Sequence, residues 1–122
     1  MKIAIDFDGT CVDHRYPNIG VDAPDAVRTL KELVAAGHQL ILYTMRHGQE
    51  LNDAVRWFGE RAIKLHGVQR DPQQDAWTGS PKCYAEIYVD DAAFGAPLIT
   101  LAKFARPCIN WMKVRQHFGL GE

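Results

Sequence analysis

The residues of this chain that could do chemistry stand in two acidic pairs. Asp6 and Asp8 are two positions apart near the N-terminus, and Asp90 and Asp91 are adjacent to one another. A carboxylate can attack a phosphorus atom, and a second carboxylate two residues later can turn back toward the same space. We therefore expect Asp6 to be a nucleophile that forms an aspartyl-phosphate. We expect Asp8 to protonate the leaving oxygen as a general acid and then to activate water as a base.

Four carboxylates in one site would repel each other and would also repel a substrate phosphate. A hard divalent cation resolves this conflict, and Mg²⁺ prefers a few carboxylates, several waters and a phosphate oxygen. The sequence therefore predicts a Mg²⁺ site. Its expected protein ligands are Asp6, the main-chain carbonyl of Asp8, and the pair Asp90 and Asp91. Which member of that pair binds the ion directly is left open.

Several other residues are placed to hold the phosphate. Gly9 allows a tight turn after Asp8, and the N–H groups of Gly9 and Thr10 can point at phosphate oxygens. Thr44 follows a second apolar run and can donate its hydroxyl group. Arg46, two residues further on, offers a charged fork for a phosphate.

A positive group must also balance the nucleophile and the transferring phosphoryl group. Lys82, eight positions before Asp90, is the best-placed lysine, and Lys64 is the alternative. His14 and Arg15 lie in the loop that follows the nucleophile, where they could reach a substrate. We expect Arg15 to be a substrate contact. For both residues a purely solvated position is the competing interpretation.

Short apolar runs alternate with helical patterns, and this order determines where the polar residues lie. Strands are predicted at 2–6, 39–43, 63–66, 86–89 and 98–101, and helices at about 24–37, 49–61 and 111–118, with Asn110 as the cap of the last helix. Residues 9–23 and 67–81 read as loops. Alternating strands and helices predict an α/β fold with a parallel sheet of about five strands.

In such sheets, ligands bind beyond the carboxyl ends of the strands. Asp6 and Asp8, then Thr44, then the pair Asp90 and Asp91 all follow the ends of predicted strands. Three polar clusters from distant parts of the chain are thus expected at one edge of the sheet. This convergence is the strongest argument for a site.

The composition agrees with an ordinary globular domain. The 122 residues fit one domain, 1–122, and the formal net charge of −1 gives no electrostatic surface for nucleic acid or an anionic membrane. No segment reaches the length of a membrane span. The three cysteines are widely spaced and suggest neither a disulfide framework nor a zinc site. We expect a cytoplasmic protein.

The order of these motifs resembles the haloacid dehalogenase superfamily of aspartate-nucleophile phosphatases. The resemblance covers DFDGT, the Tyr43-Thr44 pair, Lys82 and the YVDD run, about three-quarters of the chain. It implies a three-layer α/β/α Rossmann-like fold, with Thr44 and Lys82 holding the phosphate. The gaps after Gly9 and after Thr44 are too short for a cap domain, so the chain resembles the capless group. It is also similar to a set of small bacterial and phage proteins that carry a DHRYP segment after the first motif, here Asp13 to Pro17.

Two other interpretations compete with the phosphatase. A receiver domain also phosphorylates an aspartate, but its acceptor follows a later strand, and the predicted strand at 63–66 has no aspartate at its end. A catalytically weak phosphate-binding or regulatory module is the second alternative. The partner we expect is a phosphorylated substrate, either a small molecule or a macromolecular end. Its identity and the oligomeric state are open.

Overall fold

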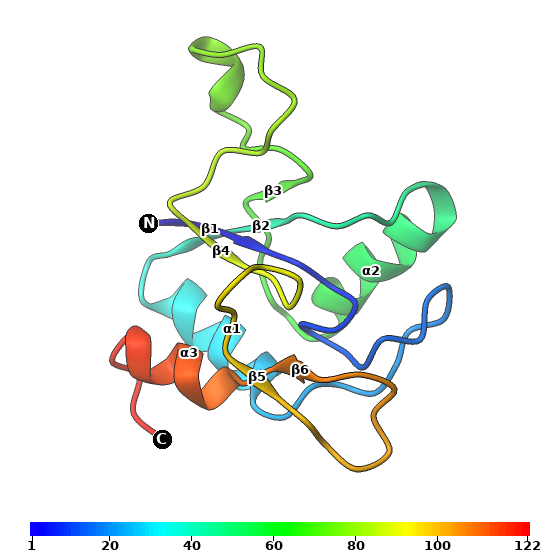
Figure 1. Cartoon of the computed structure of the whole chain (residues 1–122). Coiled ribbons are helices and arrows are strands. Elements are labelled where there is room, and N and C mark those ends of the chain that lie inside the picture. The colour runs from blue at the N-terminus through cyan, green and yellow to red at the C-terminus, as the bar shows by residue number, and fades with distance from the viewer.

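Four short parallel strands form the centre of the molecule in the computed structural model, which describes all 122 residues. The strands are β1 (Lys2–Ile5), β2 (Gln39–Leu42), β3 (Gly67–Val68) and β4 (Ile87–Val89). Their order across the sheet is β3-β2-β1-β4, so β1 has a neighbour on each side (Figure 1). Because β1 lies between β2 and β4, the residues that follow these three strands come together at one edge.

Three α-helices pack on one face of this sheet (Figure 1): α1 (Ala26–Ala35), α2 (Gly48–Glu60) and α3 (Trp111–His117). Ile3 and Ile5 of β1 point toward them and share one buried cluster with residues of all three helices. Side chains alternate along a strand, so Ala4 between them faces the other way. The predicted cap of the last helix is confirmed, because the Asn110 side chain accepts a hydrogen bond from the Met112 N–H at 3.2 Å.

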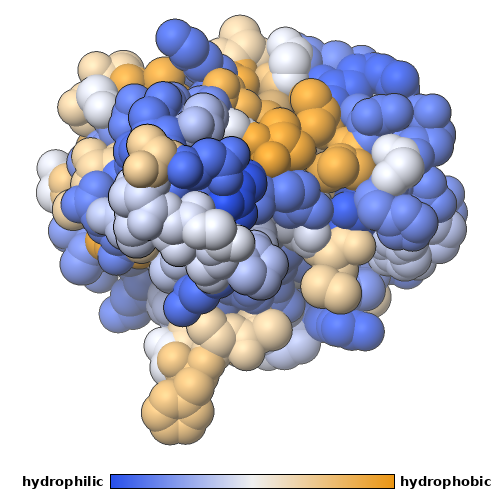
Figure 2. All heavy atoms as spheres, turned by 90° about the horizontal axis from the view of Figure 1, so that it is seen from above, coloured by the Kyte–Doolittle hydropathy of each residue, from blue (hydrophilic) through white to orange (hydrophobic).

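The opposite face of the sheet is covered by the segment 69–86, which contains the short 3₁₀ helix η1 (Gln74–Ala76). Cys83 and Ala85 of this segment are buried against Ala4 and Ile41. The buried Gln74 holds the segment in shape, because its side-chain amide donates to Lys82 O at 3.0 Å. Seen from this side, small groups of apolar atoms lie among hydrophilic ones (Figure 2).

Two further strands, β5 (Leu98–Ile99) and β6 (Cys108–Ile109), pair antiparallel in a separate small sheet. The loop between them, residues 100–107, returns to the region of the N-terminal motif. Ile109 N donates to Gly9 O at 3.1 Å, which fixes the end of β6 beside the turn after β1. The loop between β5 and β6 therefore lies within reach of the acidic residues.

The α/β class with a parallel sheet is confirmed, and three details of the prediction are wrong. The sheet has four parallel strands rather than five, because the strand predicted at 98–101 pairs with β6 instead. The third strand lies at Gly67–Val68 rather than 63–66. No α-helix covers the second face, so the architecture has two layers and a covering segment in place of three layers. None of the helices combines the length and apolar character that crossing a bilayer requires.

Candidate active site

The loops after β1, β2 and β4 enclose a cleft of about 430 Å³. Its lining joins the three predicted polar clusters with one residue, Arg106, of the loop after β5. The residues are Asp6, Asp8, His14, Tyr16, Thr44, Met45, Arg46, Asp90, Asp91, Ala92 and Arg106. The predicted convergence at the carboxyl ends of the strands is therefore present in the structure.

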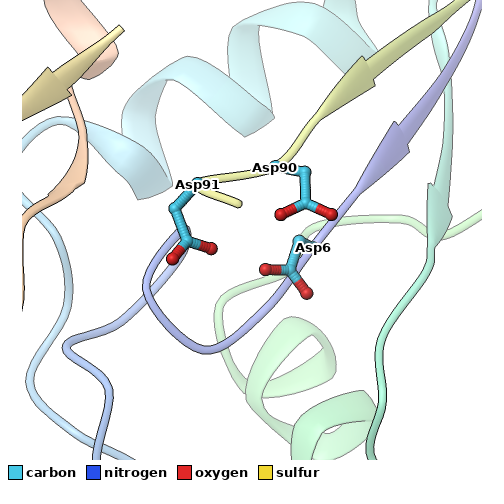
Figure 3. A group of neighbouring side chains, drawn as sticks. All are labelled: Asp6, Asp90 and Asp91. Atoms are coloured by element: carbon cyan, nitrogen blue, oxygen red, sulfur yellow. The ribbon is translucent and has the colours of Figure 1, made fainter. Parts of the chain in front are cut away.

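Asp6, Asp90 and Asp91 point into one common space (Figure 3). One carboxylate oxygen from each can be chosen so that all three lie within 4.8 Å of one another. The Thr10 hydroxyl, which is buried, lies 3.4 Å from an Asp6 oxygen and 3.2 Å from an Asp91 oxygen. It also accepts the Asp91 N–H at 3.2 Å, so Thr10 ties the two acidic loops together.

The environment of Asp6 disfavours its negative charge in the absence of a cation. Burial, the hydrogen bond to Asp91 and the charge of Asp90 together raise the pKa of Asp6 from 3.8 to about 8. Three converging oxygen donors with unbalanced charge fit a hard divalent cation such as Mg²⁺, which binds carboxylate oxygen in preference to nitrogen or sulfur. Asp6, Asp90 and Asp91 would hold it. Nothing in the structure tests the Asp8 carbonyl as a ligand, and that role stays a prediction.

Gly9 is required at the turn that follows Asp8. Its φ of +82° lies in the left-handed region, and a Cβ there would come within 2.4 Å of an Asp91 oxygen. The Gly9 N–H donates to Val12 O at 2.8 Å and the Thr10 N–H to Phe7 O at 3.1 Å. These two N–H groups are thus used inside the turn. Neither residue lines the cleft, and both support the turn beside it. Their contact with a substrate stays a prediction.

Arg46 is bound to Asp8 and is not free for a substrate, which differs from the role predicted for it. Its Nε and Nη2 atoms donate to the two Asp8 oxygens at 2.7 and 2.8 Å. The same guanidinium group donates to the carbonyl oxygens of Pro17, Asn18 and Glu50. The side chain is 1% exposed. Arg46 therefore fixes the position of Asp8 at the cleft, and a fork of this kind is stronger than a single neutral hydrogen bond.

Thr44 lines the cleft as predicted, and a residue that the sequence did not single out holds it there. The Gln69 side chain accepts the Thr44 N–H at 2.8 Å and donates to Thr44 O at 2.6 Å. The Thr44 hydroxyl accepts the Arg46 N–H at 3.1 Å, which leaves its proton available for a phosphate oxygen. No pattern in the sequence marks Gln69 as part of the site.

The two candidate lysines do not line the cleft. Lys82 belongs to the covering segment, where its Nζ lies 5.5 Å from the centre of the Tyr88 ring. It lines a separate hollow with Trp77 and Tyr84. Lys64 lines another hollow beside His38 and His66. The phosphate-balancing role expected from Lys82 or Lys64 is thus without support in this arrangement.

Of the two loop residues after the nucleophile, His14 lines the cleft and Arg15 does not. The Arg15 guanidinium donates to an Asp13 oxygen at 2.8 Å and to Lys103 O at 3.0 Å, so it joins two loops. Arg106 is a basic residue of the cleft that sequence reasoning missed. It belongs to none of the recognised motifs, which is why no local pattern indicates it.

The receiver-like interpretation gains no support from the geometry. The first acidic residue after β3 is Asp71, and its carboxylate pairs with Lys2 Nζ at 2.7 Å. Lys2 is the first residue of β1, so Asp71 lies at the end of the sheet opposite to Asp6. A phospho-acceptor aspartate after the third strand would have to lie beside Asp6.

Comparisons with known proteins agree with the fold. No protein-family model matches the chain, and no curated protein matches it. A solved structure described as the conserved protein coded by a locus from Bacteroides thetaiotaomicron superposes with a TM-score of 0.82. The two sequences are 33% identical, and the match covers 98% of this chain and 90% of that chain. Its description names no activity. The chain belongs to the same family as this conserved Bacteroides protein.

Proposed function

We propose that the chain is a Mg²⁺-dependent phosphomonoester hydrolase of the haloacid dehalogenase type, with Asp6 as its nucleophile. The observation that carries this proposal is the meeting of Asp6, Asp90 and Asp91, with one oxygen of each within 4.8 Å of the others. Three carboxylates at that spacing are destabilising unless a cation lies among them. A bound Mg²⁺ would balance their charge and that of a phosphate oxygen.

Asp6 begins the reaction. One of its oxygens forms a bond to phosphorus while the bond from phosphorus to the leaving oxygen breaks, and the electron pair of that bond stays on the leaving oxygen. The product of this step is phospho-Asp6 and a free alcohol, once the leaving oxygen has taken a proton. In the second step water attacks phosphorus, the bond to Asp6 breaks, and inorganic phosphate leaves.

Asp8 moves the proton in both steps. In the free protein both of its oxygens accept N–H groups from Arg46. This arrangement suits the base that takes a proton from the attacking water in the second step. To act as the acid of the first step, Asp8 must carry a proton and turn one oxygen away from Arg46. Substrates whose leaving oxygen needs little protonation therefore gain an advantage.

A phosphatase assay tests the proposal directly. We expect the purified protein to release phosphate from p-nitrophenyl phosphate with MgCl₂ and to lose this activity in EDTA. Asp6→Asn should reduce kcat by about 1000-fold or more, because the amide cannot form the covalent intermediate. Glu60→Gln, a matched loss of one negative charge at an exposed position of α2, should leave kcat unchanged.

The outcome also separates the enzyme from a binding module. Turnover that survives Asp6→Asn in a protein free of contaminating phosphatase would remove Asp6 as the nucleophile. A wild-type protein that binds Mg²⁺ and inorganic phosphate in calorimetry, yet turns over no phosphorylated compound in a broad screen, would be a phosphate-binding module.

A further inference from the structure

The cleft has a shortage of free positive charge. Four carboxylates line it, and its only basic side chains are His14, Arg46 and Arg106. Arg46 is buried and uses its guanidinium group on Asp8 and on three main-chain carbonyls. Apart from a metal ion, a phosphate with two negative charges would therefore find only two basic side chains in the cleft that are not bound to Asp8. These are His14 and Arg106.

Arg106 is the free one of the two arginines. It is exposed at the cleft, and its guanidinium group makes no hydrogen bond and no ion pair anywhere in the structure. Arg15 of the nearby loop is also occupied, because it donates to an Asp13 oxygen and to Lys103 O. None of the four carboxylates of the cleft pairs with this guanidinium group. It can therefore bind an anion that enters the cleft.

The loop that carries Arg106 is held at the cleft by a buried charge. Asp13 is 2% exposed, and its two oxygens accept the Ala105 N–H at 2.9 and 3.1 Å. Burial alone would raise the pKa of Asp13, but the hydrogen bonds from Ala105 and Arg15 outweigh it and hold this pKa below its usual value. A buried carboxylate is costly unless it is fully bonded. Here it fixes the main chain one residue before Arg106.

We propose that Arg106 is the phosphate-binding residue of this cleft and that it supplies the positive charge that the sequence assigned to Lys82. The inference rests on the proposed function, since it assumes that a phosphorylated compound enters the cleft. Arg106 binds the non-bridging oxygens through two N–H groups, and the Asp13–Ala105 contact positions it. The residue comes from the loop between β5 and β6, so the site includes a segment outside the three strand-end loops.

Steady-state kinetics with p-nitrophenyl phosphate and MgCl₂ test the role of Arg106. We expect Arg106→Gln to raise KM by about 10- to 100-fold, as the loss of a charge-assisted pair of hydrogen bonds implies. Arg106→Lys keeps the charge without the fork and should recover part of the loss. Lys103→Gln removes the same charge from the same loop outside the cleft, and it should leave KM within about twofold of wild type.

Calorimetric titration with inorganic phosphate in MgCl₂ makes the result independent of turnover. The Kd for phosphate should weaken in Arg106→Gln by a factor similar to that for KM and should not change in Lys103→Gln. If Arg106→Gln behaves like Lys103→Gln while the wild type hydrolyses the substrate, the inference is wrong and the proposed function stands. If the wild type binds phosphate through Arg106 but has no turnover, the proposed function is wrong and the inference stands. If the wild type neither binds phosphate nor hydrolyses the substrate, both the inference and the proposed function are wrong.

Discussion

Asp6 should make the metal-free protein less stable as the pH rises. Its pKa is about 8 in the folded protein and 3.8 when it is unperturbed, so the unfolded chain loses this proton first. Between pH 4 and pH 8 the folded state holds the proton more tightly than the unfolded state, and the free energy of unfolding falls with increasing pH. Each pKa unit corresponds to about 1.4 kcal/mol, so the full loss is on the order of 6 kcal/mol.

Asp6→Asn removes this titration, and Mg²⁺ removes the repulsion that causes it. In EDTA, the wild type should lose several kcal/mol of stability between pH 5 and pH 8.5, whereas Asp6→Asn should lose much less over the same range. Addition of MgCl₂ at pH 8 should stabilise the wild type more than the variant, because the variant has lost one ligand.

Urea unfolding followed by tryptophan fluorescence measures these differences, since Trp57 and Trp111 are buried in the core. Glu60→Gln provides the control for loss of one negative charge at an exposed site. If wild type and Asp6→Asn lose stability in parallel as the pH rises in EDTA, the carboxylates are not crowded in the way described. Equal stabilisation of both proteins by MgCl₂ would lead to the same conclusion.

Three further predictions concern Arg46, Gly9 and Lys82. Arg46→Lys should lower kcat by about 10- to 100-fold, because lysine cannot donate to both Asp8 oxygens as the guanidinium group does. In an Asp8→Asn background the same change should leave kcat almost unaltered, and a double-mutant cycle in kcat measures this. Gly9→Ala should destabilise the protein by about 2 kcal/mol or more in urea unfolding and weaken Mg²⁺ binding in calorimetry, because its Cβ would displace Asp91. Lys82→Gln should leave kcat/KM within about twofold of wild type, and a 100-fold loss would show that this lysine reaches the cleft.

The local part of the site could be predicted from the sequence because strand ends impose it. An apolar run that ends at a polar residue predicts both a buried strand and the edge at which it stops. Asp6, Thr44 and Asp90 follow three such runs, and the structure brings all three to one cleft. The two acidic pairs meet because β1 and β4 are parallel neighbours, so that the ends of both strands lie at the same edge of the sheet.

The remaining part depends on contacts that no local pattern carries. Arg46 and Asp8 are 38 positions apart, so the sequence could present Arg46 only as a free charge near a phosphate. Lys82 has a suitable position in the order of motifs, but the covering segment carries it to a separate hollow. Arg106 enters the cleft through the hydrogen bond between Asp13 and Ala105, which joins residues 92 positions apart.

The predicted number of strands in the parallel sheet was wrong for a related reason. The run from Leu98 to Leu101 has the composition of a buried strand, and its partner decides where it lies. Leu98 and Ile99 pair with β6, and both are exposed rather than buried. A two-residue strand has too little hydrophobic pattern to specify its sheet.

A crystal structure of the protein with Mg²⁺ and beryllium fluoride, a phosphoryl mimic, tests the central claim most directly. We expect beryllium bonded to an Asp6 oxygen, one Mg²⁺ in contact with the other Asp6 oxygen and with the Asp90–Asp91 pair, and the Arg106 guanidinium group on the fluorine atoms. An unmodified Asp6 in crystals grown at saturating concentrations of both, with the three carboxylates sharing no ion, would contradict it.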